Sequence, residues 1–522
     1  MNEFPTSKNP PIYTSVHFHI FSFGQALNAS YLRLKIQDMN QAIRNLEPKA
    51  MWNHFADLNA VPRPSKKEER VIAFIKKFGE DLGLPTIVDE VGNVIIKKPA
   101  STGMENRTTI VMQSHLDMVC QKNSDTNFDF DTEGIKMLVE GDWVKADGTT
   151  LGSDNGIGVA SIMAVLASND ISHPPLEALF TIDEETGMTG AMGLKGGLLD
   201  AKIMLNLDTE DDDEITIGCA GGIDVNISGS YNVEAVGENT TAYKISVTGL
   251  NGGHSGMDIH KGLGNANKLM NRLLWGTSEK FSLRIAMIDG GGLRNAIPRE
   301  SFSEVVVLND RCADFEQFVA EQTAILQSEH ATTDANLTIS LEKIDAPNKV
   351  MPIGRQQELL RSIYACPNGI YRMSPDIKGL VQTSNNLARV LVKDGEITIM
   401  CLTRGSVDSE KTDLAQAIQS TFELSALNVI FEGSYPGWAP KPEAGIVKLM
   451  SDLYIELFNE PAKVSACHAG LECGILGTNY PEMEMISFGP NIRGAHSPDE
   501  KVQISSVQKY WGFLLETLKR IA

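Results

Sequence analysis

A histidine and an aspartate stand two residues apart just after a short apolar run. The run covers residues 109–112, and His115 and Asp117 follow it. Side chains alternate along an extended chain, so these two point to the same side. A neutral imidazole binds a metal through one ring nitrogen while a carboxylate orients the ring through the other. The pair is therefore a candidate ligand and its support, although a lone histidine here is more often a loop residue.

A glycine-rich segment, residues 151–158, carries one carboxylate, Asp154, and leads into an apolar helix expected from about Gly158 to Ala167. Two interpretations compete. As a phosphate cradle, the segment lacks the lysine of G-x-x-x-x-G-K-[ST] and the spacing of G-x-G-x-x-G. As a metal loop, it brings a carboxylate close to the site on a bent backbone, where Asp154 could bridge two cations.

Adjacent carboxylates, Glu184 and Glu185, follow a second apolar run, residues 176–182. A solvated acidic turn is the usual reason for such a cluster. In a metal site, one carboxylate binds the ion and its neighbour accepts a proton from water, and the cation removes the repulsion that would otherwise raise their pKa values. Asp208 follows the run 203–207 in the same way.

Two histidines near the C-terminus compete as the remaining ligand. His496 lies in a turn-rich loop where a core histidine would be unusual, and His468 is its rival. Ligand chemistry alone does not choose between them. Histidines and carboxylates together supply the mixed nitrogen and oxygen donors that suit Zn²⁺, Co²⁺ or Mn²⁺. Two-metal hydrolases hold such ions about 3.5 to 4 Å apart, so the sequence indicates a metal-dependent hydrolase.

These residues need a scaffold that gathers separate strand ends. Short apolar runs alternate with helical patterns, such as residues 51–58, and this alternation predicts an α/β domain with a mainly parallel or mixed sheet. Functional side chains in such sheets gather past the carboxyl ends of the strands. Ser65 and Glu68 have the spacing of a capping box and predict the start of a further helix.

The length of the chain predicts more than one domain, because 522 residues exceed the size at which a single core keeps growing. Residues 222–437 change to alternating strands joined by amphipathic helices, which predicts an inserted α+β domain. Residues 39–221 and 438–522 would form the α/β domain. Residues 1–38 remain unassigned, and Met39 is the expected start of the working domain.

The composition excludes several partners. A net charge of −21 argues against nucleic acid. The seven cysteines form no C-x-x-C pair and fit reduced thiols. No stretch approaches the roughly 18 to 20 apolar residues of a membrane helix, and the N-terminus lacks the features of a signal peptide. We therefore expect a soluble cytoplasmic protein without nucleic-acid or membrane partners.

Taken in chain order, these residues resemble the M20 family of metallopeptidases. The motifs that carry the resemblance are His115-x-Asp117, Gly152-x-Asp154-x-Gly156, Glu184-Glu185-x-Gly187, Asn206-x-Asp208 and the late His496. The strings HLDMV, GTTLGSDNGIG, GCAGGID, GGHSG, LRNAIPRE, YPGW, HAGLECG and GAHSPDE are similar to its aminoacyl-histidine dipeptidases. The resemblance runs from about Met51 to the C-terminus and does not cover residues 1–38.

The resemblance implies a di-zinc exopeptidase-like domain, with a mixed sheet flanked by helices, and an inserted lid and dimerisation domain. It also implies two divalent cations, zinc first and cobalt or manganese as alternatives. The implied metal ligands are His115 and Asp208 for one ion, Glu185 and His496 for the other, and Asp154 between them. Glu184 would be the general base, Asp117 would orient His115, and the peptide bond between Asp154 and Asn155 would be cis.

The resemblance assigns further residues to the insert. His254 would stabilise the developing oxyanion, and Asn295, Arg404 and the backbone at Gly470 would hold the C-terminal carboxylate and carbonyl of a dipeptide. A homodimer is expected. A large insert could deliver His254 within its own chain or to a partner's site, and the sequence leaves both arrangements open.

The implied reaction is hydrolysis of unblocked dipeptides, with a preference for Xaa-His substrates such as β-alanyl-histidine. Other M20-type reactions, tripeptide trimming or deacylation of N-acyl amino acids, are the main alternative. A serine hydrolase is disfavoured because G-x-S-x-G is missing from the sequence. An inactive binding protein is disfavoured as well, since all five ligand positions, the base and the orienting carboxylate are present.

Overall fold

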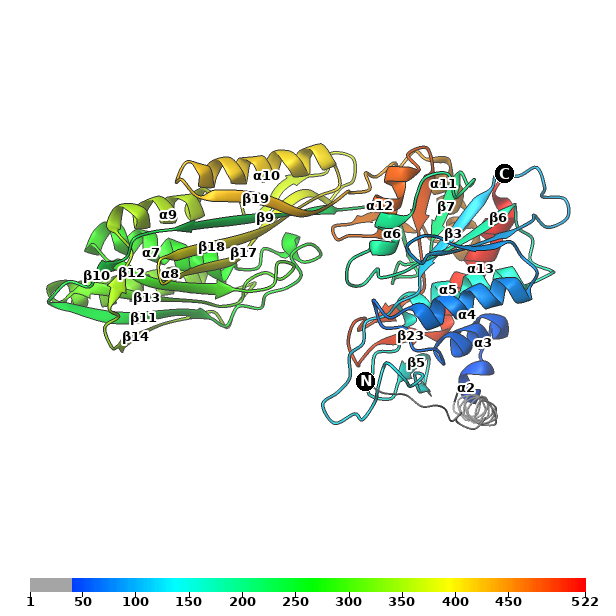
Figure 1. The fold of residues 1–522 in the computed structure, drawn as a ribbon, viewed down its shortest axis with the longest axis horizontal. Coiled ribbons are helices and arrows are strands. Elements are labelled where there is room, and N and C mark those ends of the chain that lie inside the picture. The colour runs from blue at the N-terminus through cyan, green and yellow to red at the C-terminus, as the bar shows by residue number, and fades with distance from the viewer. Residues whose placement is uncertain (1–39) are drawn as a thin grey trace, which may run out of the picture.

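The computed structural model describes residues 40–522 and folds them into two lobes that lie end to end (Figure 1). The first lobe contains both ends of the described chain, and the second consists of residues between them. The chain leaves the first lobe between β8 (Glu214–Cys219) and β9 (Gly221–Ser230), and it returns after β19 (Asn428–Tyr435). The expected start at Met39 and the segment 1–38 lie outside the described residues.

An eight-stranded sheet forms the centre of the first lobe. Its strands, in spatial order, are β1 (Thr86–Val88), β2 (Val94–Lys98), β6 (Leu176–Thr181), β3 (Ile110–His115), β7 (Ile203–Asn206), β21 (Glu484–Ser487), β8 and β20 (Lys463–Cys467). Strands β6, β3, β7 and β21 run parallel, whereas β1, β2 and β6 pair in antiparallel fashion. The sheet is therefore mixed, as predicted, and the ends of its parallel strands meet at one edge.

Helices cover both faces of this sheet. Alternate residues of one strand enter different cores: Ile110 and Met112 pack into one cluster, and Val111 packs into another. The first core is closed by α3 (Lys49–Leu58), α4 (Glu69–Asp81), α5 (Ser153–Ala167), α11 (Gly445–Phe458) and α13 (Ile504–Arg520). The second core is closed by α6 (Thr189–Gly193) and α12 (Glu472–Asn479).

Smaller elements complete the first lobe. The short helix α2 (Gln41–Arg44) packs on α3. An antiparallel sheet contains β22 (Ile492–Arg493), β23 (Lys501–Gln503), β5 (Trp143–Ala146) and β4 (Met137–Glu140).

Two expectations about local structure need correction. The helix expected from about Gly158 begins at Ser153, and Asp154 and Asn155 inside its first turn have non-helical backbone angles. The capping box expected at Ser65 does not form, because α4 begins at Glu69 without a side-chain cap. The Ser65 hydroxyl instead donates a hydrogen bond of 2.8 Å to the Asp117 carboxylate, and hydrogen bonds to an ionised acceptor are stronger than neutral ones.

The second lobe is an antiparallel sheet with helices packed against one face (Figure 1). Its strands, in spatial order, are β14 (Thr338–Ile344), β11 (Thr240–Thr248), β13 (Ser301–Leu308), β12 (Arg284–Gly291), β17 (Val381–Lys393), β18 (Glu396–Gly405), β9 and β19, with β16 (Gly369–Met373) paired to β17. Its helices are α7 (Ala266–Phe281), α8 (Cys312–Glu329), α9 (Ile353–Ala365) and α10 (Asp408–Glu423). The short elements are β10 (Glu234–Ala235), β15 (Lys349–Val350), η1 (Ile259–Lys261) and η2 (Asn309–Arg311). An inserted α+β unit was expected, and the fold class is confirmed.

The two chain crossings between the lobes lie side by side. Cys219 and Trp438 exchange backbone hydrogen bonds of 2.9 Å in both directions. The two crossings are thereby held together at the base of the second lobe. Among residues 40–522, no helix combines the length and apolar character that crossing a membrane requires.

Candidate metal centre and substrate pocket

His115 is the last residue of β3 and is buried at the edge where the parallel strands end. Its Nδ1 lies 3.4 Å from a carboxylate oxygen of Asp117. Its Nε2 faces the opposite way, 3.1 Å from Asp154 Oδ1 and 3.6 Å from Asp208 Oδ1. One side of the ring is therefore held in place, and the other is directed at two carboxylates.

The Asp117 carboxylate binds three other groups besides His115. It accepts backbone N–H bonds from Glu184 at 3.0 Å and Glu185 at 3.2 Å, and a hydroxyl bond from Ser65. The loop after β6, which carries both glutamates, is thus fixed to the end of β3. A fully buried carboxylate needs such donors, because an unpaired one would be costly.

Asp154 lies between the two histidines. Its Oδ1 faces His115, and its Oδ2 lies 3.1 Å from Nε2 of His496. The peptide bond from Asp154 to Asn155 is cis, as the resemblance implied. The Asn155 side chain donates to the backbone oxygen of Leu207 at 2.8 Å and to the Asp208 carboxylate, which ties the first turn of α5 to the end of β7.

Glu185 and His496 complete the cluster. Glu185 Oε2 lies 3.1 Å from His496 Nε2, while its Oε1 is buried without a hydrogen-bond partner within the described part of the chain. The ligand atoms of His115, Asp154 and Glu185 all lie within 4.8 Å of one another. The His496 side chain is 55% exposed, so the cluster opens toward solvent on that side.

Glu500 is a residue that the sequence interpretation missed. Its buried carboxylate accepts N–H bonds from Leu151 at 2.8 Å, Gly152 at 3.0 Å and Ser153 at 2.7 Å, and a weaker one from Asp154 at 3.3 Å. The Ser153 hydroxyl adds a bond of 2.6 Å. Glu500 stands in the same loop as His496, so it fixes that loop to the segment that presents Asp154. The string GAHSPDE, which contains both His496 and Glu500, was the sequence signal that could have identified it.

Several carboxylates lie close to two imidazoles in this cluster, and burial and these neighbours shift their pKa values. Burial raises the pKa of Glu184 well above its usual value, although the charge of His115 opposes the effect. Burial also raises the pKa of Glu185. Hydrogen bonds to Asp154 and Glu185 raise the pKa of His496 to about 11. Positive charge at this position is therefore favoured by the surrounding carboxylates.

This donor set fits two divalent cations. Four carboxylates, on Asp154, Glu184, Glu185 and Asp208, carry a charge that two divalent ions would match. Imidazole nitrogens and carboxylate oxygens are borderline-to-hard ligands of the kind that zinc, cobalt and manganese accept. Oε1 of Glu185, which has no partner among residues 40–522, is a buried acceptor that a cation would satisfy.

His468, the rival ligand, does not belong to this cluster. It lies on the segment between β20 and α12, and its Nε2 lies 2.8 Å from the hydroxyl of Ser384 in β17 of the second lobe. Burial and the nearby Arg404 lower the pKa of His468 to about 3, so the ring is neutral. His468 connects the two lobes beside the crossings.

His254 and Asn295 lie on two loops of the second lobe that are joined by a backbone hydrogen bond. The Ser255 N–H donates to the Asn295 carbonyl oxygen at 2.7 Å. Nδ1 of His254 accepts N–H bonds from Gly256 at 3.2 Å and Met257 at 3.0 Å. Because Nδ1 is an acceptor, the neutral ring carries its proton on Nε2. Burial and Arg404 lower the pKa of His254 to about 4, which keeps the ring neutral.

Arg404 and Gly470 approach each other from different lobes. Arg404, in β18, is 5% exposed and donates from Nη1 to the Tyr435 hydroxyl at 2.9 Å. A methyl group added at Gly470 would lie 3.2 Å from the Tyr435 ring. The turn that carries His254 also reaches this region, since a methyl group at Gly256 would lie 2.1 Å from the His468 carbonyl oxygen. Residues from both lobes therefore contact one another around Tyr435 and His468.

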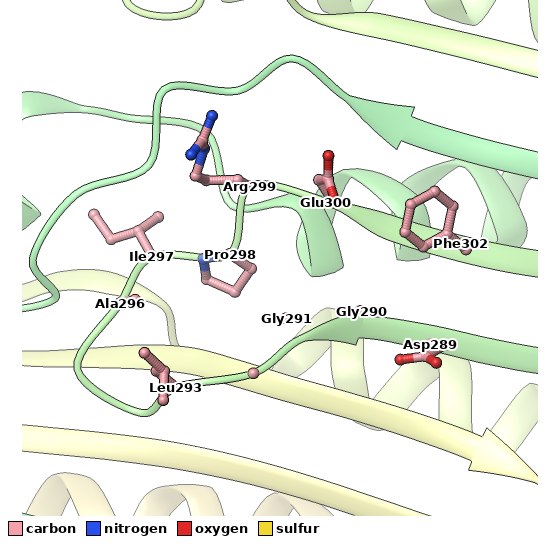
Figure 2. A pocket seen from close by; sticks show the side chains of 11 residues that line it. Asp289, Gly290, Gly291, Leu293, Ala296, Ile297, Pro298, Arg299, Glu300 and Phe302 are labelled. Atoms are coloured by element: carbon pink, nitrogen blue, oxygen red, sulfur yellow. The ribbon is translucent and has the colours of Figure 1, made fainter. Parts of the chain in front are cut away.

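A separate cavity of about 410 Å³ lies in the second lobe between the ends of β12 and β13 (Figure 2). The loop that carries Asn295 borders it, with Leu293, Ile297 and Pro298 around its rim (Figure 2). None of the metal-centre residues lines this cavity. It lies beside the Asn295 loop and apart from the acidic cluster.

Comparison with known proteins identifies the family. The family model described as Peptidase family M20/M25/M40 matches residues 111–520. The chain belongs to this family. It is 44% identical over 480 residues to the cytosol non-specific dipeptidase of Escherichia coli strain K12, which covers 92% of this chain and 99% of that protein.

Two solved structures extend the comparison of this M20 protein. The aminoacylhistidine dipeptidase of Vibrio alginolyticus superimposes with a TM-score of 0.86 at 41% identity, covering 92% of this chain and 98% of that one. The aminopeptidase PepT of Bacillus cereus has a TM-score of 0.54 at 15% identity over 91% of this chain and 99% of that one, which shows the fold alone. Family membership makes this chain a peptide hydrolase, and both the M20 resemblance and the enzyme prediction are confirmed.

Proposed function

We propose that this M20 protein hydrolyses dipeptides at a centre of two divalent cations. The observation that carries the proposal is the acidic cluster around His115 and His496, with its unpartnered Glu185 oxygen, in a chain 44% identical to a dipeptidase over nearly its whole length. Zinc is the first candidate, with cobalt or manganese as alternatives.

The proposed ligands follow from which side chains face each other. His115 and Asp208 would hold one cation, Glu185 and His496 would hold the second, and Asp154 would contribute one oxygen to each. When bound, two such cations polarise a scissile carbonyl and lower the pKa of an attacking water.

Glu184 is the proposed general base. It lies in the loop that Asp117 holds, beside Glu185, and it makes no ion pair with a lysine or arginine in the described chain. Its carboxylate would accept the proton of the attacking water and pass it to the leaving amine.

Residues of the inserted lid, which we place at residues 222–437, would bind the parts of the substrate that lie beyond the metal centre. Nε2–H of His254 is the donor we assign to the developing oxyanion, since Nδ1 is already occupied as an acceptor. Arg404 would pair with the free carboxylate of the substrate, assisted by Asn295 and the backbone at Gly470. Capture of that carboxylate would favour dipeptides over longer chains.

Several finer points belong to the same proposal. We place the α/β catalytic domain at residues 39–221 and 438–522. We also propose a cytoplasmic homodimer that prefers Xaa-His dipeptides such as β-alanyl-histidine. A monomer mass in light scattering at micromolar concentration would overturn the dimer.

The test removes the proposed base without removing a ligand. Glu184→Gln should bind two cations per chain yet lose about 10²–10⁴-fold in kcat, the range that general acid–base catalysis commonly contributes. Metal content and kcat on alanyl-histidine would be measured together. Glu90→Gln, at a carboxylate that is 79% exposed and paired with Lys195, is the matched control.

An active Glu184→Gln protein with full metal content would remove Glu184 from the mechanism. Alanyl-histidine, a tripeptide and an N-acyl amino acid should be assayed side by side on the parent protein. Faster turnover of either of the last two would favour the alternative M20 reactions.

A further inference from the structure

Three residues on adjacent strands of the second lobe form one row beside the lobe crossings. Gly222 in β9 pairs with Arg404 in β18 on one side and with Tyr435 in β19 on the other. A methyl group at Gly222 would lie 2.6 to 2.7 Å from Cε1, Cζ and the hydroxyl oxygen of Tyr435. The Tyr435 ring therefore lies directly over Gly222, which has no side chain to obstruct it.

This placement brings the Tyr435 hydroxyl to the Arg404 guanidinium. Nη1 of Arg404 donates to it at 2.9 Å, whereas Nε of Arg404 is buried without a partner among residues 40–522. The other edge of the ring faces Gly470, since a methyl group added there would lie 3.2 Å from Cε2 of Tyr435. A guanidinium accepts no hydrogen bond, so the hydroxyl hydrogen of Tyr435 is left to donate elsewhere.

The Tyr435 backbone is fixed as firmly as its ring. Nζ of Lys411, a nearly buried side chain, donates to the Tyr435 carbonyl oxygen at 2.5 Å and to Asp408 Oδ1 at 2.8 Å. Asp408 Oδ1 also accepts the Gly437 N–H at 3.1 Å. The backbone of Tyr435, the last residue of β19, is thus held to α10, while its ring lies over Gly222 of the neighbouring strand.

We propose that Tyr435 is a specificity-determining residue for the substrate's free carboxylate. Its hydroxyl orients the Arg404 fork by accepting one N–H, and it donates its own hydrogen to the carboxylate that the fork binds. The ring also forms the wall opposite Gly470. This inference rests on the proposed dipeptidase function, in which Arg404 receives the substrate carboxylate.

The test compares free and amidated substrates in Tyr435→Phe, which keeps the ring and removes the hydroxyl. For a free dipeptide, KM should rise about tenfold with kcat changed less than about threefold, as expected for one hydrogen bond to a charged group. For the same dipeptide as its C-terminal amide, KM should change less than about twofold. Tyr371→Phe, on the exposed side of β16, is the matched control and should match the parent.

A second variant, Gly222→Ala, should displace the ring and reproduce the selective loss on the free dipeptide. An equal rise in KM for acid and amide, or no rise in Tyr435→Phe, would overturn the role of Tyr435. A parent protein that cleaves no dipeptide at all would instead overturn the proposed function, so the two failures are distinguishable.

Discussion

At the scale of single residues, two buried carboxylates organise the candidate centre without facing its open side. Asp117 orients His115 and holds the loop of Glu184 and Glu185. Glu500 holds the loop before α5 and carries the His496 loop with it. Each carboxylate satisfies backbone N–H groups that would otherwise be buried without acceptors. The spacing between proposed ligands therefore depends on residues outside the ligand set.

The role of Glu500 is testable by a neutral replacement. Glu500→Gln cannot accept all of these N–H bonds, because one of its two terminal atoms is itself a donor. We expect cation affinity to fall by about 10- to 100-fold, as is typical for outer residues of metal sites. Titration of the metal-free protein with Zn²⁺ would measure the change.

Asp499→Asn is the control for the Glu500 variant, since Asp499 lies in the same loop with an exposed side chain. We expect Asp499→Asn to bind Zn²⁺ as tightly as the parent protein and Glu500→Gln to bind it more weakly. Unchanged affinity in both variants would show that Glu500 does not support the centre.

At the scale of elements, α5 is the helix that connects the candidate centre to the core. It is apolar and buried all round, which is typical of a helix enclosed by other elements. Its close approach to the sheet depends on Gly158. A methyl group there would lie 2.2 Å from Asn155 Oδ1, 2.4 Å from Ser114 Oγ and 2.9 Å from the Leu207 carbonyl oxygen.

We expect Gly158→Ala to lower the free energy of unfolding by about 1–3 kcal/mol, because overpacking forces backbone or side chains to shift. Urea unfolding of the metal-free protein would measure it. Gly512→Ala in α13 is the matched control, since no atom of residues 40–522 lies within 4 Å of the added methyl group. That variant should be neutral or gain up to about 1 kcal/mol from helix propensity. Equal stability of the two variants would contradict the close packing of α5.

At the scale of the whole molecule, the proposed active site draws on both lobes. The acidic cluster belongs to the first lobe, whereas His254, Asn295 and Arg404 belong to the second (Figure 1). His468 and Tyr435 lie where the lobes meet. Cation binding and substrate binding should therefore be separable, because they involve different lobes.

Removal of the cations tests whether catalysis and stability depend on metal. A chelator should abolish dipeptide hydrolysis and lower the thermal midpoint, because a ligand that binds only the folded state stabilises it. Zinc, cobalt or manganese should restore both. Glu184→Gln should show the same change in midpoint while remaining inactive, since its proposed ligands are intact. Full activity in the chelated protein would contradict a metal-dependent mechanism.

The amino-acid sequence by itself determined the fold class and the chemistry of the candidate centre. Alternating apolar runs predicted the α/β sheet, because strand and helix periods are local properties of the chain. Polar residues placed after those runs located His115, Glu185 and Asp208 at strand ends. The family resemblance added the cis bond at Asp154 and selected His496 over His468.

Only the tertiary structure decided what each side chain contacts. Ser65 matched a capping pattern yet donates to Asp117, and Glu500 looked like one acid among many yet accepts four backbone N–H groups. Tyr435 reaches Arg404 because Gly222 lies between them on neighbouring strands. Such contacts join residues far apart in the chain, and local spacing contains no information about them. Burial then decides their importance, since a buried polar group must find its partner within the fold.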